Sequence, residues 1–177
     1  MTGFGRPELL SPDHEVEAFD CGAAAQTEWL RKYALQAQRA DTSRVYVSCY
    51  AATQRVAGYY ALAAGSIGTG DAPDRVARGA ARYPIPVILL TRLGVDLDAQ
   101  GHGLGRSLVH DAFLQTASIA ERLGVRALLI HAETPEAATF YRRIDPAFQP
   151  SPTDPLHLIL LIKDLRLAIR DAAEPEG

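Results

Sequence analysis

The residues best suited to chemistry form a glycine loop, QGHGLGR at residues 100–106, between an apolar strand and an amphipathic helix. Its glycines alternate, at positions 101, 103 and 105. Glycine lets backbone N–H groups approach an anion closely, and the start of the following helix adds unpaired amides and a positive dipole end. Arg106 can add a charge-assisted contact. The loop therefore predicts a phosphate or pyrophosphate site, with a plain strand-to-helix turn as the alternative.

The loop does not match two common nucleotide-binding fingerprints. The dinucleotide pattern GxGxxG fails because the third glycine falls one place early, and the sequence has no GK[ST] for a Walker A loop. The position of the loop, after a strand and before a helix, is what favours a ligand cradle over a turn.

The elements that must position this loop follow from hydrophobic periodicity. The pattern predicts a helix at residues 23–40, then an antiparallel hairpin with strands at 44–50 and 56–64 and a loop at 65–74. A short arginine-rich stretch, 74–83, leads to a strand at 87–95 and a helix at 104–123, which Gly124 ends as a C′ residue. A strand at 125–132, a short helix at 135–143 and a strand at 156–162 precede a charged C-terminal helix. These elements predict one α/β or α+β domain over residues 1–177.

Length and charge bound the possibilities. A chain of 177 residues can bury a core without disulfides or metal, and the two cysteines, Cys21 and Cys49, form no CxxC motif. We therefore expect no metal site. The N-terminus lacks the pattern of a signal peptide and no apolar run approaches 18 residues, so we expect a cytoplasmic protein that does not enter membranes. The net charge of -3 argues against non-specific coating of nucleic acid.

The glycine loop contains the pattern Q-x-x-G-x-G, formed by Gln100, Gly103 and Gly105, close after the strand residues LGVD. It looks like the acetyl-CoA motif of the GNAT N-acetyltransferase superfamily. Further segments narrow the match: FDCG at 19–22, GYYALAAGS at 58–66, GVRALLIHA at 124–132 and FY at 140–141. Together, over roughly residues 14–165, they are similar to the TacT-like GNAT toxins of bacterial toxin-antitoxin modules.

This resemblance implies a GNAT fold: a mixed, mostly antiparallel central sheet with splayed strands and helices on both faces. It also implies acetyl-CoA as co-substrate, with its pyrophosphate on the backbone amides of the loop and its pantetheine along the edge of the preceding strand. The residues that it assigns to acetyl-CoA are Leu93, Gly94, Val95, Gln100, Gly101, His102, Gly103, Leu104, Gly105, Arg106 and Phe140.

Tyr141 is the candidate catalytic residue. Acetyl transfer needs a proton for the departing thiolate, and a phenol with a pKa near 10 can supply it while remaining protonated at neutral pH. The resemblance implies the same role for the tyrosine of this FY pair. The alternative is that Phe140 and Tyr141 are core aromatics of a short helix.

The sequence offers no convincing general base. Glu133, His131 and His102 are near the predicted site in sequence, yet each also reads as a strand cap, a core histidine or a loop residue. A lysine amine is almost fully protonated at pH 7, whereas an α-amino group near pKa 7.7–8.0 is already partly neutral. The resemblance implies such a substrate, the amino acid on charged tRNA, whose acetylation blocks translation.

A tRNA-binding protein needs local positive charge. Residues 75–95 hold four arginines and no acid, and two more arginines follow Tyr141. The predicted tRNA-binding residues are Arg75, Arg78, Arg82, Arg92, Arg142 and Arg143. The alternative is a set of surface arginines paired with acids from elsewhere, with Arg92 as a structural ion-pair member. Ser43 and either Tyr59 or Tyr60 are further candidates for the acceptor side.

The resemblance also implies a ribbon-helix-helix antitoxin and a homodimer. One segment departs from it, since IDPAFQP at 144–150 stands where the family usually has a short Gly-Phe turn. The resemblance therefore does not define the rim of the acceptor pocket or the amino-acid preference. Two other functions remain as alternatives: a GNAT enzyme acting on a small amine or a protein N-terminus, and a CoA-binding or partner-binding module without turnover.

Overall fold

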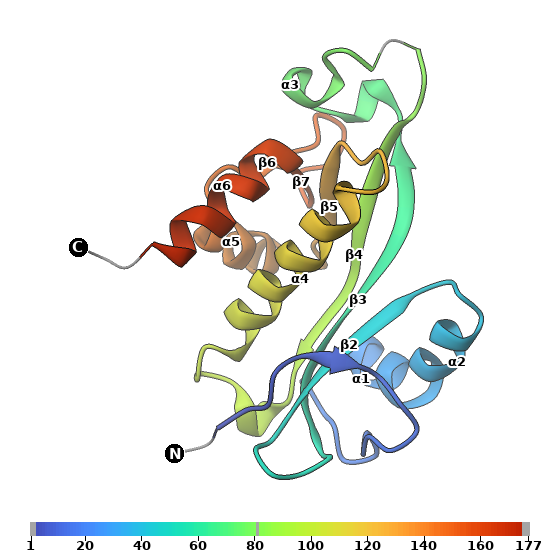
Figure 1. Ribbon diagram of the computed structural model, residues 1–177, viewed down its shortest axis with the longest axis vertical. Helices are drawn as coiled ribbons and strands as arrows, with labels where there is room; N and C mark the ends of the chain where they lie inside the picture. The colour runs from blue at the N-terminus through green and yellow to red at the C-terminus, as the bar shows by residue number, and fades with distance from the viewer. Residues whose placement is uncertain (1–2, 81, 175–177) are drawn as a thin grey trace. The chain divides into compact units, whose positions relative to one another are not determined.

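The computed structural model describes residues 3–80 and 82–174, and seven strands among them form one sheet (Figure 1). The strand order is β1-β2-β3-β4-β5-β7-β6. The pairs β1/β2, β2/β3, β5/β7 and β6/β7 are antiparallel, whereas β4/β5 is parallel. The mixed, mostly antiparallel sheet expected from the resemblance is confirmed.

The strands are β1 (Glu8–Leu9), β2 (Arg44–Cys49), β3 (Val56–Ile67), β4 (Ile85–Val95), β5 (Ala127–His131), β6 (Gln149–Pro150) and β7 (His157–Leu161). The helices are α1 (Ala24–Glu28), α2 (Ala34–Arg39), α3 (Asp74–Ala77), α4 (Leu104–Ala120), α5 (Pro135–Ile144) and α6 (Ile162–Ala173). Shorter turns are the π-helical η1 (Trp29–Tyr33) and the 3₁₀ turns η2 (Thr69–Asp71) and η3 (Leu97–Ala99).

The chain divides into two compact units, and β3, β4 and α4 contribute residues to both. Unit 1 comprises Met1–Ala63 and Thr91–Ala112, and unit 2 comprises Ala64–Leu90 and Phe113–Gly177. The expectation of a single domain over residues 1–177 stays a prediction.

Unit 1 is built around the β2/β3 hairpin. Tyr59 and Tyr60 alternate along β3 and are both fully buried, so they lie on opposite faces of the hairpin. Tyr59 packs on Phe19 and Trp29, with ring centroids 5.6 Å and 6.1 Å away. The segments α1, η1 and α2 form the helix predicted at 23–40, interrupted by a π-helical turn in which the Ala34 N–H donates to the Trp29 carbonyl, five residues earlier.

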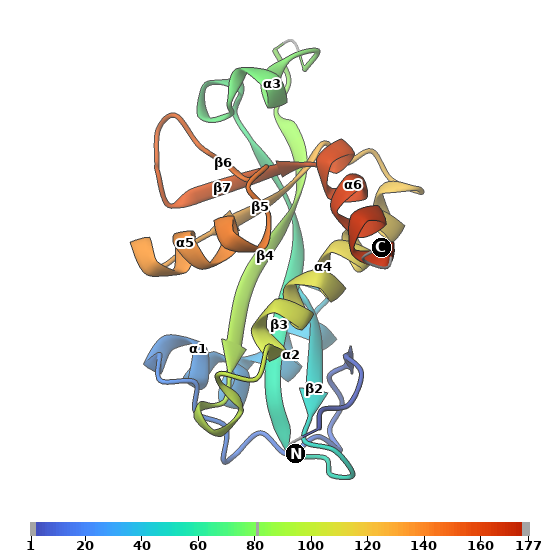
Figure 2. The same cartoon turned by 90° about the vertical axis from the view of Figure 1, so that its left-hand side faces the viewer.

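Unit 2 is built around β5, which pairs in parallel with β4 and antiparallel with β7. Its core includes Val76, Ile85, Val87, Leu129 and Ile159. Because β5 and β7 run in opposite directions, α5 follows the end of β5 while α6 starts beside the beginning of β5 (Figure 2). The two helices therefore mark opposite ends of this strand pair.

The predicted elements are present, with differences in extent and two additional short strands. Two two-residue strands, β1 and β6, are too short for periodicity to reveal. β3 extends to Ile67, into the predicted loop. α4 ends at Ala120, and Gly124 is not among the described residues with positive φ, so its expected C′ role was wrong. No described helix is long and apolar enough to span a membrane.

Candidate functional site

The glycine loop in unit 1 has the backbone that its sequence suggested. Gly101 and Gly103 have φ values of 81° and 80°, in the left-handed region that side chains with a Cβ rarely adopt. A Cβ built on either would meet nothing within 4 Å, so the space in front of the backbone is open. Gly103 accepts the first helical bond, from the Ser107 N–H at 3.1 Å, and the N–H groups that follow it have no intrahelical acceptor. These features fit an oxyanion such as a pyrophosphate.

Gln100, predicted to contact acetyl-CoA, also ties protein segments together. Its side-chain amide donates to the carbonyls of Val95 at 3.0 Å and Cys21 at 3.1 Å. The FDCG segment is thereby bonded to the end of β4 at the entry to the glycine loop. His102 and Arg106 are exposed on the loop. Gln100 is thus a positioning residue for the residues around it.

At the end of β4, which is predicted to line the pantetheine arm, position 94 has room for no residue larger than glycine. A Cβ on Gly94 would lie 3.0 Å from the Tyr59 ring and 3.3 Å from the Cys21 sulfur. Its neighbours Leu93 and Val95 are half-buried. The strand edge that the resemblance assigns to pantetheine is therefore closely packed on its Gly94 side.

Asp96 is a residue at this site that the sequence analysis missed. Asp96 is 3% exposed, and its carboxylate accepts bonds from the Asp20 N–H and from the Tyr50 hydroxyl, with Arg55 at 3.4 Å. Its backbone carbonyl also accepts from the N–H groups of Ala99 and Gln100. Asp96 therefore anchors the start of the glycine loop to two distant segments. Burial and the bond to this carboxylate raise the pKa of Tyr50.

Neither tyrosine of the GYYAL segment is free to line an acceptor pocket with its hydroxyl. The Tyr59 hydroxyl donates to the Gln26 carbonyl at 2.7 Å, and the Tyr60 hydroxyl donates to the Asp111 carboxylate. Tyr60 also stacks on Tyr46 at 5.0 Å. Burial, followed by the bond to Asp111, raises the pKa of Tyr60.

Tyr141 lies in unit 2 on α5, with a side chain that is only 7% exposed. Its ring contacts Phe140 edge-on at 5.2 Å and Phe148 at 6.4 Å. Phe148 belongs to segment 144–150, whose sequence differs from that of the family, so this segment packs against the candidate acid. Burial, and secondarily the charge of Glu133, raise the pKa of Tyr141. Within residues 3–80 and 82–174, no group hydrogen-bonds the Tyr141 hydroxyl.

The start of α5 fixes the helix that carries Tyr141. Thr134 is its N-cap and accepts from the Ala137 N–H at 3.1 Å, and Pro135 follows in the first turn. We expect Thr134→Ala to lower the free energy of unfolding by about 1 kcal/mol. Urea denaturation checks this value. Thr139→Ala, on the same helix, is the control and should change stability by less than about 0.5 kcal/mol, and an equal loss in both variants would contradict the cap.

The predicted basic residues are not all equivalent. Arg92, in unit 1, donates to the Gln26 side chain at 3.1 Å and lies over the Trp29 ring at 5.4 Å, which is a structural role. Arg75, in unit 2, forms a two-bonded ion pair with Asp164. Four others in unit 2 are exposed: Arg78, Arg82, Arg142 and Arg143.

The candidate bases have structural partners where the structure describes them. His131 stacks on His157 with centroids 3.8 Å apart. Burial, then the charge of His157, lowers the pKa of His131. His102 lies near the Phe4 ring, at 6.4 Å.

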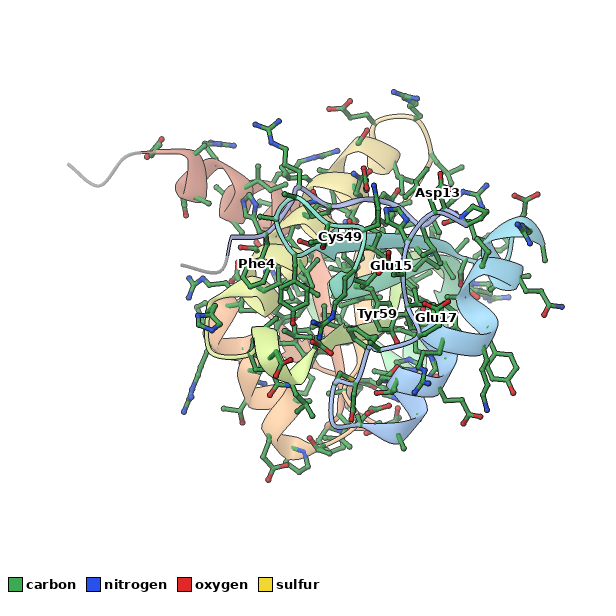
Figure 3. The ribbon with its side chains drawn as sticks, turned by 90° about the horizontal axis from the view of Figure 1, so that it is seen from below. Phe4, Asp13, Glu15, Glu17, Cys49 and Tyr59 are labelled. Atoms are coloured by element: carbon green, nitrogen blue, oxygen red, sulfur yellow. The ribbon has the colours of Figure 1, made fainter. Side chains whose placement is uncertain are left out.

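Folding also brings together Glu8, His14 and Cys49, a grouping that sequence spacing did not reveal. Cys49 of this group is labelled in Figure 3. The ligand atoms of the three lie within 4.8 Å of one another. The Ser11 N–H donates to His14 Nδ1 at 2.9 Å, so His14 Nε2 carries the proton and donates to Glu8 at 2.7 Å. Hydrogen bonding that fastens β1 to the following turn therefore explains the positions of Glu8 and His14.

Comparison with known proteins finds relatives along almost the whole chain. A tRNA-acetylating toxin from Mycobacterium tuberculosis is 45% identical over 171 residues, which cover 97% of this chain and 100% of the relative. The chain belongs to the tRNA-acetylating toxin family. A probable toxin TacT from Sinorhizobium fredii is 30% identical over 168 residues, covering 90% of this chain and 92% of that relative. No protein-family model matches the chain.

Solved structures agree with this family. AtaT complexed with acetyl-methionyl-tRNAfMet is similar with a TM-score of 0.84 and 26% identity, covering 93% of this chain and 98% of AtaT. A tyrosine-to-phenylalanine mutant of KacT has the same TM-score at 23% identity, covering 92% of this chain and 97% of KacT, and it supports the fold. The resemblance to GNAT-type toxins of toxin-antitoxin modules is confirmed.

Proposed function

We propose that this protein transfers an acetyl group from acetyl-CoA to the α-amino group of an aminoacyl-tRNA and thereby blocks translation. The observation that carries the proposal is the 45% identity, over 97% of the chain, to a protein named tRNA-acetylating toxin. AtaT, at 26% identity, has been solved with acetyl-methionyl-tRNAfMet and with acetyl-CoA.

Acetyl-CoA would be held by the glycine loop and the end of β4. The open, left-handed backbone at Gly101 and Gly103 supports this assignment, because a side chain at either position would strain the loop. The amides from Gly101 to Arg106 would bind the pyrophosphate, and Arg106 would add charge. Gln100 and Asp96 hold the loop in position through the bonds described above.

Tyr141 would donate the proton that the thiolate leaving group needs. A buried phenol with a raised pKa remains protonated at the pH of the reaction, which a general acid requires. The acceptor amine then has to lose its own protons without a strong protein base. An α-amino group, partly neutral near pH 7.7–8.0, meets that requirement better than a lysine side chain.

The test is acetyl transfer from radiolabelled acetyl-CoA to charged tRNA. We expect label on aminoacyl-tRNA and none on deacylated tRNA, and we expect induced expression to arrest growth. Polyamine and peptide acceptors, offered in parallel, separate this reaction from that of a small-amine GNAT enzyme. Consumption of acetyl-CoA by those acceptors alone, with charged tRNA unlabelled, would refute the proposal.

We propose the binding partners of this protein from the complexes in which similar proteins have been solved. AtaT has been solved with the C-terminus of the antitoxin AtaR, and KacTA has been solved with DNA. A ribbon-helix-helix antitoxin, a homodimer and a cytoplasmic location are accordingly proposed for this chain. Co-expression with the protein of a neighbouring short reading frame should relieve growth arrest, and light scattering of the purified toxin should give twice the mass of one chain.

A further inference from the structure

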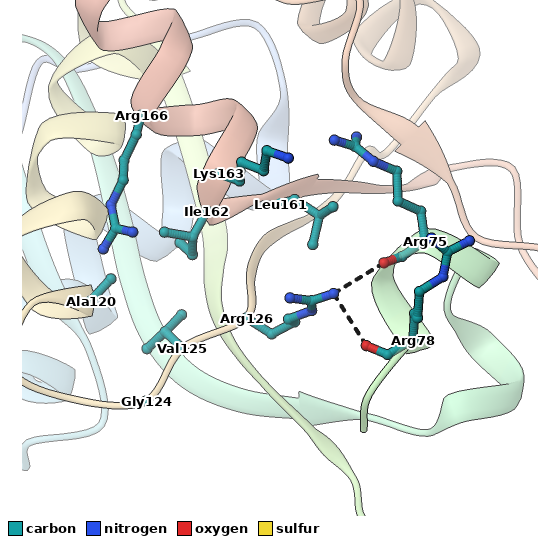
Figure 4. A pocket seen from close by; sticks show the side chains of 10 residues that line it. All are labelled: Arg75, Arg78, Ala120, Gly124, Val125, Arg126, Leu161, Ile162, Lys163 and Arg166. Carbon is teal, nitrogen blue, oxygen red and sulfur yellow. Dashed lines mark hydrogen bonds between the residues drawn. The ribbon is translucent and has the colours of Figure 1, made fainter. Parts of the chain in front are cut away.

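Unit 2 contains a basic pocket of about 510 Å³ (Figure 4). Its lining comes from α3 and the residue after it, the last residue of α4, residues 124–126 just before β5, the end of β7, and α6. Among the described lining residues five are cationic and none is acidic: Arg75, Arg78, Arg126, Lys163 and Arg166. We call this feature the basic pocket.

Arg126 builds the wall of the basic pocket. Its guanidinium donates to the carbonyls of Arg75 at 3.1 Å, Val76 at 3.2 Å and Arg78 at 3.3 Å, which close the C-terminal end of α3 (Figure 4). Its backbone carbonyl accepts from the Ile162 N–H at 3.1 Å, at the start of α6. One residue therefore fixes α3 and α6 on the two sides of the pocket, which keeps the other cations in place.

The charge of the basic pocket is only partly neutralised. Asp164 pairs with Arg75 and removes one positive charge. Within the part of the chain that the structure describes, Arg78, Lys163 and Arg166 have no ion pair. Their mutual repulsion in a protein whose net charge is -3 favours an anionic ligand. Most of these cations are arginines, whose planar fork suits phosphate oxygens.

The basic pocket is separate from Tyr141 within unit 2. Val125 and Arg126 line it just before β5, whereas α5 and Tyr141 follow the other end of that strand. Five strand residues span about 17 Å, a distance that corresponds to several nucleotides of RNA. Phosphates bound in the pocket would therefore belong to the body of a nucleic acid rather than to the nucleotide that reacts.

We propose that the basic pocket binds the phosphodiester backbone of the tRNA, away from its aminoacylated end. The proposal rests on the proposed function for its choice of RNA. It differs from the sequence-based assignment, because three of its cations, Arg126, Lys163 and Arg166, lie outside the arginine-rich stretch and become neighbours only on folding.

The binding test uses deacylated tRNA, titrated against the full chain at several salt concentrations. We expect Arg166→Glu to weaken binding about tenfold and to reduce the slope of log K against log salt by about one, and Lys163→Glu to act similarly. Arg170→Glu is the matched control, because it makes the same charge change one turn later on α6 at an exposed residue outside the pocket lining. Circular dichroism and Tm of each variant establish that it is folded.

The activity test compares aminoacyl-tRNA with aminoacyl-adenosine, which has no phosphodiester backbone. We divide kcat/KM for aminoacyl-tRNA by kcat/KM for aminoacyl-adenosine. We expect Arg166→Glu to lower this ratio about tenfold and Arg170→Glu to leave it unchanged.

Several results would overturn the proposal. Equal losses of tRNA affinity in Arg166→Glu and Arg170→Glu would mean that overall charge, not the pocket, governs binding. The Arg166→Glu variant could also bind tRNA as tightly as the wild type while inorganic phosphate binds to the wild type and not to the variant. That result would mean that the basic pocket is a site for a small anion and not for tRNA. A third outcome separates the two proposals: the wild-type protein acetylates neither acceptor, but the Arg166→Glu variant binds tRNA more weakly than the wild type does. In that case the proposed function fails while the pocket assignment stands.

Discussion

Replacing Tyr141 with phenylalanine is expected to reduce acetyl transfer roughly 100-fold to 10,000-fold, the usual contribution of a general acid. The ring is buried against Phe140 and Phe148, and phenylalanine keeps those contacts. No described group hydrogen-bonds the hydroxyl, so its removal leaves no protein group unpaired. We therefore expect the variant to fold with an unfolding free energy within about 1 kcal/mol of the wild type. Steady-state kinetics with labelled acetyl-CoA and urea denaturation measure the two quantities.

The matched control is Tyr83→Phe, since Tyr83 is 77% exposed and also in unit 2. It should leave the rate unchanged. A Tyr141→Phe enzyme with more than about a tenth of the wild-type kcat would contradict the assignment of Tyr141 as the acid.

The pH dependence of the wild-type rate follows from the same residue. The pKa of Tyr141 is raised above its ordinary value near 10, so the phenol stays protonated below that pH. The rate should rise as the acceptor α-amine deprotonates, near pH 7.7–8.0, and should show no decline from Tyr141 ionisation before about pH 10. Because the folded state holds this proton more tightly, the stabilisation from Tyr141 is complete below pH 10 and is lost as the pH rises above it.

Replacing Asp96 with alanine is expected to have the largest effect on stability, a loss of about 3 to 5 kcal/mol of unfolding free energy. Asp96 is 3% exposed, and its carboxylate accepts from the Asp20 N–H and the Tyr50 hydroxyl. Its removal leaves these two donors without their acceptor and leaves the guanidinium of Arg55 with the exposed carboxylate of Asp98 alone. The start of the glycine loop would lose its attachment at the same time, so the KM for acetyl-CoA should also rise.

Asp98→Ala provides the comparison, since Asp98 lies at the same 3.4 Å from Arg55 but its side chain is 79% exposed. An exposed ion pair contributes little, so we expect a change below about 1 kcal/mol. Urea denaturation of both variants measures the difference. Similar small losses in both would indicate that the Asp96 network does not stabilise unit 1.

The glycine loop was predictable because its chemistry is local. Gly101 and Gly103 stand where the backbone turns into α4, and only glycine adopts such φ values readily. The β2/β3 hairpin was predictable for the same reason, because alternation and a short turn are both local signals. Gly124 shows the limit of such rules: the Leu123 N–H still donates to the Ile119 carbonyl, so helical bonding decays gradually before Gly124 is reached.

The partners of buried polar residues were not predictable. Arg75 and Asp164 are 89 positions apart, and Tyr60 and Asp111 are 51 apart, so no sequence spacing relates them. For the same reason the arginine-rich stretch read as one basic zone, although Arg92 is bound to Gln26 and Arg75 to Asp164. A run of arginines in the sequence therefore does not predict a basic surface, because folding pairs some of these side chains with partners from distant segments.

The π-helical turn η1 has a consequence for how the length of this chain can change. Its bond from the Ala34 N–H to the Trp29 carbonyl encloses one residue more than an α-helical bond does. Removing one exposed residue from it, such as Arg31 or Lys32, would leave a regular helix, with Leu30 and Ala34 still directed into the core. We therefore expect this turn to be a place inside a helix where the protein accepts a deletion, a kind of variation that is more common in loops.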